Sequence, residues 1–154
     1  MKKIILILSA VILTSCVTES RMYPRQYSLK NNSNQNIKLK FYLTSNNQLS
    51  NEIIINDNQI FTSGEIKFSK PHSTDPDYIV AVSEFSKGGD SLIVIYSDLK
   101  KSNFYIDFNG NFSAPIDRNP YRFGNYTDIG NDTFQFIFTE EDYNNSVDCG
   151  GNCD

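Results

Sequence analysis

The chain has 154 residues, with 14 Lys and Arg against 18 Asp and Glu, a formal net charge of −4 and 39% hydrophobic residues. This length fits a single domain, and the 13% of aromatic residues argues against a disordered chain. The acidic balance argues against binding to nucleic acid, because affinity for phosphates depends on clustered Lys and Arg.

The N-terminus has the layout of a cleaved export signal. Lys2 and Lys3 form a positive start, and Ile4 to Leu13 is an apolar run interrupted only by Ser9. A helix that spans a bilayer needs about 20 apolar residues, so this signal helix is too short to be a good permanent anchor. We expect residues 1–15 to be removed.

Leu13-Thr14-Ser15-Cys16 ends this run with an aliphatic residue, two small residues and a cysteine. The motif resembles the lipobox of bacterial lipoproteins. The resemblance implies that the Cys16 thiol receives a diacylglyceryl group and that the lipoprotein signal peptidase cuts just before it. Two or three acyl chains, such as palmitate, would then anchor the protein to the membrane stably. The alternative is an ordinary secreted protein whose Cys16 is buried or paired.

Residues 16–26 are polar and contain Pro24, so we predict a lipidated tether between membrane and domain. The second residue of the mature chain would be Val17. Some diderm bacteria retain lipoproteins in the inner membrane by an Asp at this position. By that analogy, we expect a lipid-anchored protein of the cell envelope, in the outer membrane, and the leaflet it occupies stays open.

After the tether, short runs of β-branched and aromatic residues alternate with clusters of Asn, Asp, Gly and Ser. This spacing predicts an all-β domain over residues 27–146, an antiparallel β-sandwich with a small barrel as the alternative. In Ile37 to Leu43, apolar residues alternate with Lys38 and Lys40. That pattern predicts a half-buried strand whose lysines face solvent.

The longest apolar runs of the domain are Tyr78 to Val82 and Ser91 to Tyr96, with Lys87-Gly88-Gly89-Asp90 between them. The two glycines favour a tight turn, so we predict a central hairpin whose strands are buried on both faces. The preceding loop, Pro71 to Pro76, holds the single histidine, His72. We interpret His72 as a solvated loop residue rather than a catalytic one.

The C-terminal half is predicted to contain two further strands, Phe104 to Phe108 and Thr133 to Thr139. The second of them has three phenylalanines on one face. Asp107 to Asn111 lacks the late acidic ligand of an EF-hand loop, so we predict a turn that ends a strand, and no metal or other cofactor. Thr139 before three acidic residues, 140–142, predicts an N-capped short helix up to about Ser146.

Ala114 to Gly130 is a long irregular segment, and such a loop in a compact domain is either functional or poorly ordered. Tyr121, Arg122, Phe123 and Tyr126 are residue types that are favoured at interfaces. They form a candidate binding loop for a protein or glycan partner. The alternative is that these aromatic residues pack against their own domain.

The tail, residues 147–154, holds Cys149 and Cys153, the only thiols left if Cys16 is lipidated. In an exported protein we expect a disulfide between them, with free thiols and metal or redox use as alternatives. We expect this ring to order the tail with little effect on the fold. Ser91, within Asp90-Ser91-Leu92, resembles a site at which some diderm bacteria O-glycosylate exported proteins, and the alternative is an unmodified strand start.

The body of the chain resembles small uncharacterised lipoproteins of diderm bacteria. The similarity lies in an Asn-rich opening strand, the Gly-Asp-Ser-aliphatic hairpin and a Phe-rich closing strand followed by acidic residues and a tyrosine. It implies a fold rather than an activity. No catalytic constellation is evident, so we expect a non-catalytic binding or structural module, not an enzyme. The alternative is an envelope hydrolase that uses carboxylates clustered by the fold.

Overall fold

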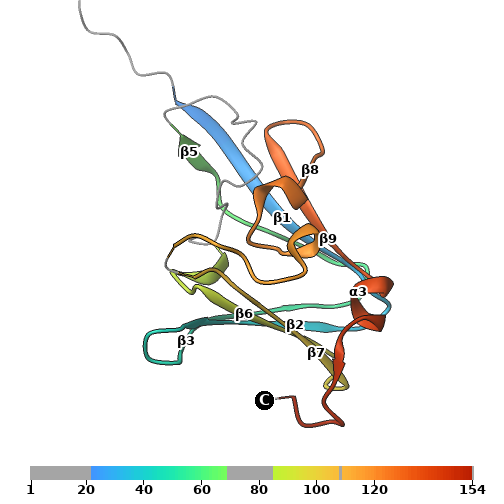
Figure 1. The fold of residues 1–154 in the computed structure, drawn as a ribbon. Coiled ribbons are helices and arrows are strands. Elements are labelled where there is room, and N and C mark those ends of the chain that lie inside the picture. Colours follow the sequence, from blue (N-terminus) through green and yellow to red (C-terminus); the bar gives the residue numbers. More distant parts are fainter. Residues whose placement is uncertain (1–21, 69–84, 108, 154) are drawn as a thin grey trace, which may run out of the picture.

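The structure, a computed structural model, describes residues 22–68, 85–107 and 109–153. Strands dominate, and they form two sheets (Figure 1). In chain order the elements are β1 (Tyr23–Asn32), β2 (Ile37–Leu43), β3 (Gln48–Ile55), β4 (Ile60–Thr62), β5 (Ile66–Phe68), β6 (Ser91–Tyr96), β7 (Lys100–Tyr105), η1 (Ile116–Arg118), η2 (Phe123–Asn125), β8 (Thr127–Asp128), β9 (Thr133–Thr139), α3 (Glu140–Asn144) and β10 (Val147–Asp148). The described residues thus form the predicted all-β sandwich and not the alternative closed barrel.

The first sheet has the strand order β4-β1-β9-β8, with β5 also paired to β1, and the second has the order β10-β7-β6-β2-β3. Among the described residues, paired strands are antiparallel with one exception. β1 and β9 run parallel, from Gln26 opposite Thr133 to Asn32 opposite Thr139. Parallel neighbours need a long connection between them. Here most of the domain lies between the two strands in sequence, so this parallel pair joins the N-terminal and C-terminal parts of the chain within the first sheet.

The core lies between the two sheets and is built by alternate residues of the strands. In β2 and β9 the buried apolar residues are Ile37, Leu39, Phe41, Phe134, Phe136 and Phe138. Lys38 and Lys40 of β2 are partly exposed on the opposite face. The alternation predicted for both strands is therefore confirmed, and burial of each large apolar side chain contributes about 1.5 to 3 kcal/mol.

β6 is a central strand, but its neighbours differ from the predicted hairpin. Ser91 to Tyr96 pairs along its whole length with β2 on one side and with β7 on the other. No edge of β6 is left for the predicted partner, residues 78–82, which lie outside the described residues. The prediction of this pairing was wrong because a glycine turn signals that the chain reverses, not which strand it then joins.

Two predicted boundaries also differ from the structure. Residues 23–26 were assigned to the tether, but β1 begins at Tyr23, and Arg25 pairs with Ile66 of β5. The strand predicted over 104–108 is β7, which begins at Lys100. It begins earlier because Ser97 and Asp98 both have positive φ, at 47° and 57°, and reverse the chain directly after β6, so that Lys100 pairs with Tyr96.

The tail is part of the second sheet rather than an extension beyond the last strand. Val147–Asp148 forms β10, which pairs with β7. Cys149 and Cys153 are joined by a disulfide, and Cys153 is only 3% exposed. Lys101 Nζ donates a hydrogen bond to the carbonyl of Cys153 at 3.3 Å. The tail docks here because the edge of β7 offers backbone groups that need partners.

Replacing both tail cysteines by serine should loosen the tail more than it weakens the domain. The chain-entropy contribution of so short a ring is about 2 kcal/mol, and the tail can detach from β7 while the other strands stay folded. Hydrogen exchange should accelerate at the backbone N–H of position 149, which donates to the Leu99 carbonyl at 2.9 Å. Amides of β6 should keep their exchange rates. A loss of several kcal/mol in the global free energy of unfolding would contradict this expectation.

The predicted helix after the closing strand is α3, and its N-terminus is capped as expected. The Thr139 hydroxyl accepts a hydrogen bond from the Asp142 N–H, and the Asp142 carboxylate accepts one from the Thr139 N–H. This reciprocal pair is a capping box, which satisfies two backbone donors at the helix start. The acidic residues at positions 140–142 are thus explained by a helix terminus.

Candidate functional site

The connecting loop, residues 114–126, forms the second part of the connection from β7 to β8 and contains η1 and η2. Figure 1 shows it lying between the two sheets. Tyr121 and Phe123 are 2% and 6% exposed, and Tyr126 packs against the core. Buried rings cannot contact a partner, so the predicted interface role is wrong for Tyr121 and Phe123, while Tyr126 is partly buried and keeps some exposed surface. They face inward because large aromatic surfaces gain most by filling the space between the sheets.

Tyr121 and Tyr126 use their hydroxyl groups to hold the connecting loop in place. Tyr126 donates to the carbonyl of Pro120 at 2.8 Å, and Tyr121 donates to the carbonyl of Gly89 at 3.4 Å. Burial raises the pKa of both hydroxyls well above the usual value for tyrosine. Both therefore remain neutral hydrogen-bond donors over the whole physiological pH range.

Two asparagines brace the backbone of the connecting loop. Asn119 is fully buried, its Nδ2 donates to the Ser113 carbonyl at 3.1 Å, and its Oδ1 accepts from the Tyr121 N–H at 3.0 Å. Asn125 Nδ2 donates to the carbonyls of Ile116 and Asn119 at 2.7 and 2.9 Å. An irregular segment lacks the regular backbone-to-backbone hydrogen bonds of a sheet, and these side chains supply hydrogen bonds in their place. They hold the loop in one conformation.

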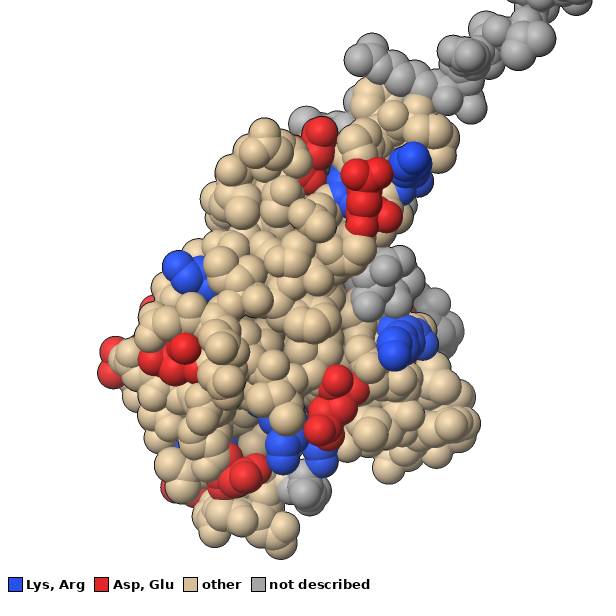
Figure 2. All heavy atoms as spheres, turned by 180° about the vertical axis from the view of Figure 1, so that it is seen from behind, with Lys and Arg blue, Asp and Glu red and all other residues tan. Residues whose placement is uncertain are grey.

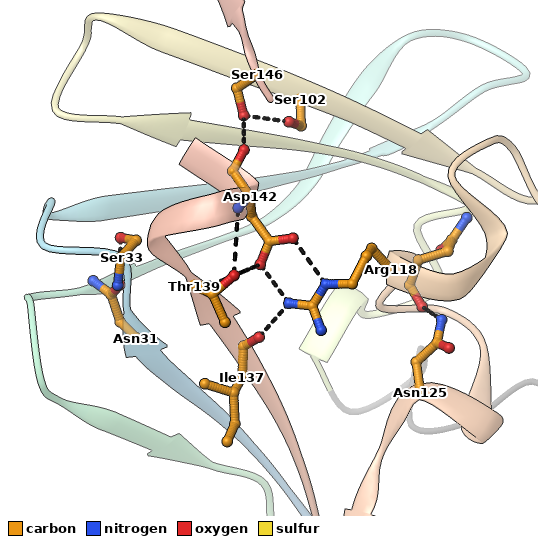
Figure 3. A network of polar contacts seen from close by, with 10 residues as sticks. Asn31, Ser33, Ser102, Arg118, Asn125, Ile137, Thr139, Asp142 and Ser146 are labelled. Atoms are coloured by element: carbon orange, nitrogen blue, oxygen red, sulfur yellow. Dashed lines mark hydrogen bonds and ion pairs between the residues drawn. The ribbon is translucent and has the colours of Figure 1, made fainter. Parts of the chain in front are cut away.

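An ion pair fastens the connecting loop to α3 (Figure 3). Arg118 Nε donates to Asp142 Oδ1 at 2.8 Å, and a second guanidinium nitrogen bonds Asp142 Oδ2 and the Ile137 carbonyl. The guanidinium also lies over the ring of Phe136, 4.9 Å from its centroid. Hydrogen bonding to Asp142 raises the pKa of Arg118. Because the same carboxylate caps α3, Asp142 has a structural role here.

Outside the core, the connecting loop and the turn before it border a groove. Its volume is about 350 Å³, and it is lined by Gly110, Asn111, Phe112, Ile116 and Arg122. Ile116 is 49% exposed, whereas Phe112 is partly buried against the core. Of the four predicted binding residues, Tyr121, Arg122, Phe123 and Tyr126, only Arg122 lines this groove. The groove combines apolar side chains with one cation, a combination suited to a ligand that has both characters.

The turn that precedes the groove is organised by Asp107. Its Oδ1 accepts hydrogen bonds from the N–H groups of Asn109 and Asn111 at 2.9 and 2.8 Å, and its Oδ2 accepts one from Asn111 Nδ2 at 2.9 Å. Gly110 has a φ of 83°, which an L residue rarely adopts. The hydrogen bonds from Asn111 hold the pKa of Asp107 below its ordinary value. The carboxylate is therefore committed to the predicted turn.

Changing Asn111 to Ala should raise the pKa of Asp107 toward the ordinary value for aspartate, because the largest contribution to its lowering is the bond from the Asn111 side chain. A carboxyl whose pKa is lowered by folding stabilises the fold above its unfolded pKa, and this stabilisation is lost as pH falls through the folded pKa. The turn should thus resist acid better in the wild type than in the variant. A ¹³C NMR titration of the Asp107 carboxyl measures this, and equal pKa values in the two proteins would contradict it.

The remaining predicted sites have different outcomes. Ser91 is the half-buried first residue of β6, and the carboxylate of the preceding Asp90 accepts a hydrogen bond from the Thr44 N–H at 2.7 Å. Cys16 and His72 lie outside the described residues. Over the described ranges, no group of three or more His, Cys, Asp and Glu side chains is placed to hold a metal ion. Within the same ranges, no helix has the length and apolar character needed to span a bilayer.

In comparisons with known proteins, the chain matches no family model, no curated protein and no solved structure.

Proposed function

We propose that this chain is a lipid-anchored lipoprotein of the bacterial cell envelope, and that its β-sandwich is a non-catalytic module that binds a protein or glycan partner. The anchor is the acylated Cys16, and Val17 after it favours the outer membrane. The observation that supports the binding role is the rigid connecting loop, whose outer side borders the groove with Arg122.

The position of β1 supports a domain held close to the membrane. β1 begins at Tyr23, the seventh residue after Cys16, and its first residues pair with β5. Seven extended residues span at most about 25 Å. In Figure 1 the start of β1 and β5 lie at one end of the molecule, away from the C-terminus. The end of the sandwich with β5 would therefore face the lipid.

The distribution of charge supports a partner other than nucleic acid. On the face shown in Figure 2, the Lys and Arg side chains of the described residues lie singly or in small groups beside Asp and Glu. That face has no basic stripe of the kind that phosphate backbones require.

The environment of Asp142 supports a non-catalytic role over the hydrolase alternative. Its side chain is 13% exposed, but both carboxylate oxygens are engaged by Arg118 and by the helix cap. A general acid or base must be within hydrogen-bond reach of a substrate proton, and this carboxylate is occupied by structural donors. Purified domain that released soluble fragments from isolated envelope material would contradict the non-catalytic proposal.

Changing Cys16 to Ser should move the protein from the membrane fraction to the soluble fraction, because the variant lacks the thiol that carries the lipid. Two or more acyl chains give stable anchoring, and the variant would lack them. The measurement is immunoblotting of fractionated cells after a high-salt wash. The matched control is the double Cys149→Ser, Cys153→Ser variant, which should stay with the membrane. A Cys16→Ser protein that fractionates like the wild type would refute the anchor.

A further inference from the structure

We infer that the groove lined by Gly110, Asn111, Phe112, Ile116 and Arg122 binds a partner through a carboxylate attached to an apolar group, as at the C-terminal residue of a peptide. This inference rests on the proposed binding role and specifies the chemistry that the site recognises.

The size and lining of the groove fit the apolar part of such a ligand. A volume of about 350 Å³ is within the range of small-ligand sites, and it would hold one large side chain with its terminal carboxylate. Ile116, 49% exposed, and the partly buried Phe112 supply apolar contact. Covering the exposed part of Ile116 would add favourable burial on binding.

The charge of the groove fits a single carboxylate. The Arg122 side chain is 21% exposed, and among its partners is Asp117, whose Oδ1 lies 3.6 Å from the guanidinium. The Asp117 side chain is 98% exposed, and so exposed an ion pair contributes little stability. A ligand carboxylate can therefore displace Asp117 at small cost, and a planar guanidinium favours bidentate contact with a carboxylate.

The bracing of the connecting loop fits a binding surface that exists before the ligand arrives. Asn125 fixes the carbonyl of Ile116, and Arg118 fixes the same short helix to α3. Asn111 is held in its turn by Asp107. Ordering of mobile groups reduces affinity, so a surface that is already fixed retains more of its contact energy.

The test is fluorescence anisotropy with the mature lipidated protein, which begins at Cys16, in detergent. The probe is fluorescein-Gly-Gly-Leu-Phe with a free C-terminal carboxylate, and the matched probe is the same peptide as a C-terminal amide. The variants are Arg122→Gln, Arg122→Lys and Asp117→Asn. The control is Lys67→Gln, which removes one exposed positive charge from β5. Near-UV circular dichroism checks that each variant keeps the fold.

We expect the carboxylate probe to bind wild type about tenfold more tightly than the amide, since one charge-assisted contact contributes at least that factor. Arg122→Gln should remove this preference, and Arg122→Lys should keep part of it because a lysine cannot make the bidentate contact. Asp117→Asn should strengthen binding severalfold, because it removes the competing carboxylate. Lys67→Gln should leave the affinity within about twofold of wild type.

Equal affinity of the wild type for the two probes would overturn the inference. It would also be overturned if Arg122→Gln and Lys67→Gln lost the same amount of affinity for the carboxylate probe, or if Asp117→Asn bound that probe more weakly than wild type. If Arg122→Gln fails to fold, the comparison of the two probes on wild type and the affinity of the Asp117→Asn variant still test the inference. Failure of the inference differs from failure of the proposed function. If only the inference fails, a partner captured by the wild-type protein binds Arg122→Gln equally well. If the proposed function fails, the wild-type protein is found in the soluble fraction or hydrolyses envelope material.

Discussion

Replacing Phe136 by Ala should lower the free energy of unfolding by about 3 to 5 kcal/mol, the range for removing a large aromatic ring from a packed core. Phe136 is 1% exposed, and its ring centroid lies 4.9 Å from that of Phe138 and 5.6 Å from that of Tyr126. Arg118 lies over the same ring. The truncation would thus leave a cavity where β9, the connecting loop and the ion pair meet.

Urea denaturation of the unlipidated protein measures this loss. Ile54 provides a control of comparable size, because it is 61% exposed on β3, and its change to Ala should cost no more than about 0.5 kcal/mol. Equal costs for the two substitutions would show that the face of β9 assigned to the core is wrong.

Changing Asp142 to Ala should cost about 2 to 4 kcal/mol. Loss of the helix cap contributes about 1 kcal/mol, and loss of charge-assisted hydrogen bonds to a partly exposed guanidinium contributes the remainder. The Arg118 side chain is 38% exposed, so solvent compensates part of its lost partner.

Thermal and urea denaturation can separate these contributions. Glu141→Ala removes an exposed acid from the same helix turn and is the matched control, with an expected cost below about 0.5 kcal/mol. The Arg118→Ala, Asp142→Ala double variant should lose less than the sum of the two single variants, because the two residues share one contact. Additive losses would show that Asp142 acts through the helix cap alone.

Much of the fold could be predicted from local patterns. The alternation in β2 and β9 and the Thr139 cap each depend on residues close together in sequence, and the structure confirms them. Such signals work because the period of a strand and the geometry of a helix start are set by the backbone itself.

The strand pairings could not be predicted in the same way. The sequence of β6 does not specify that β2 and β7 are its neighbours. The parallel pairing of β1 with β9 joins strands from opposite ends of the domain sequence. These contacts depend on how two whole sheets bury their apolar faces, which is a property of the complete chain.

In the candidate site, too, some features could be predicted from residues close together in sequence and others could not. Arg122 was identified by residue type, but its neighbours Tyr121 and Phe123 have the same interface-like character and are core residues. Arg118 was missed because its partner Asp142 lies 24 positions away and no spacing rule joins them. Burial, rather than residue type, decides which loop residues can reach a ligand.

Mass spectrometry of the protein extracted from membranes tests the central proposal most directly. The proposal predicts an N-terminal peptide that begins at Cys16 and carries a diacylglyceryl group, with residues 1–15 absent. An N-terminal peptide that still contains residues 1–15, or a mature peptide whose Cys16 carries no lipid, would contradict the account of this chain as a lipid-anchored envelope module.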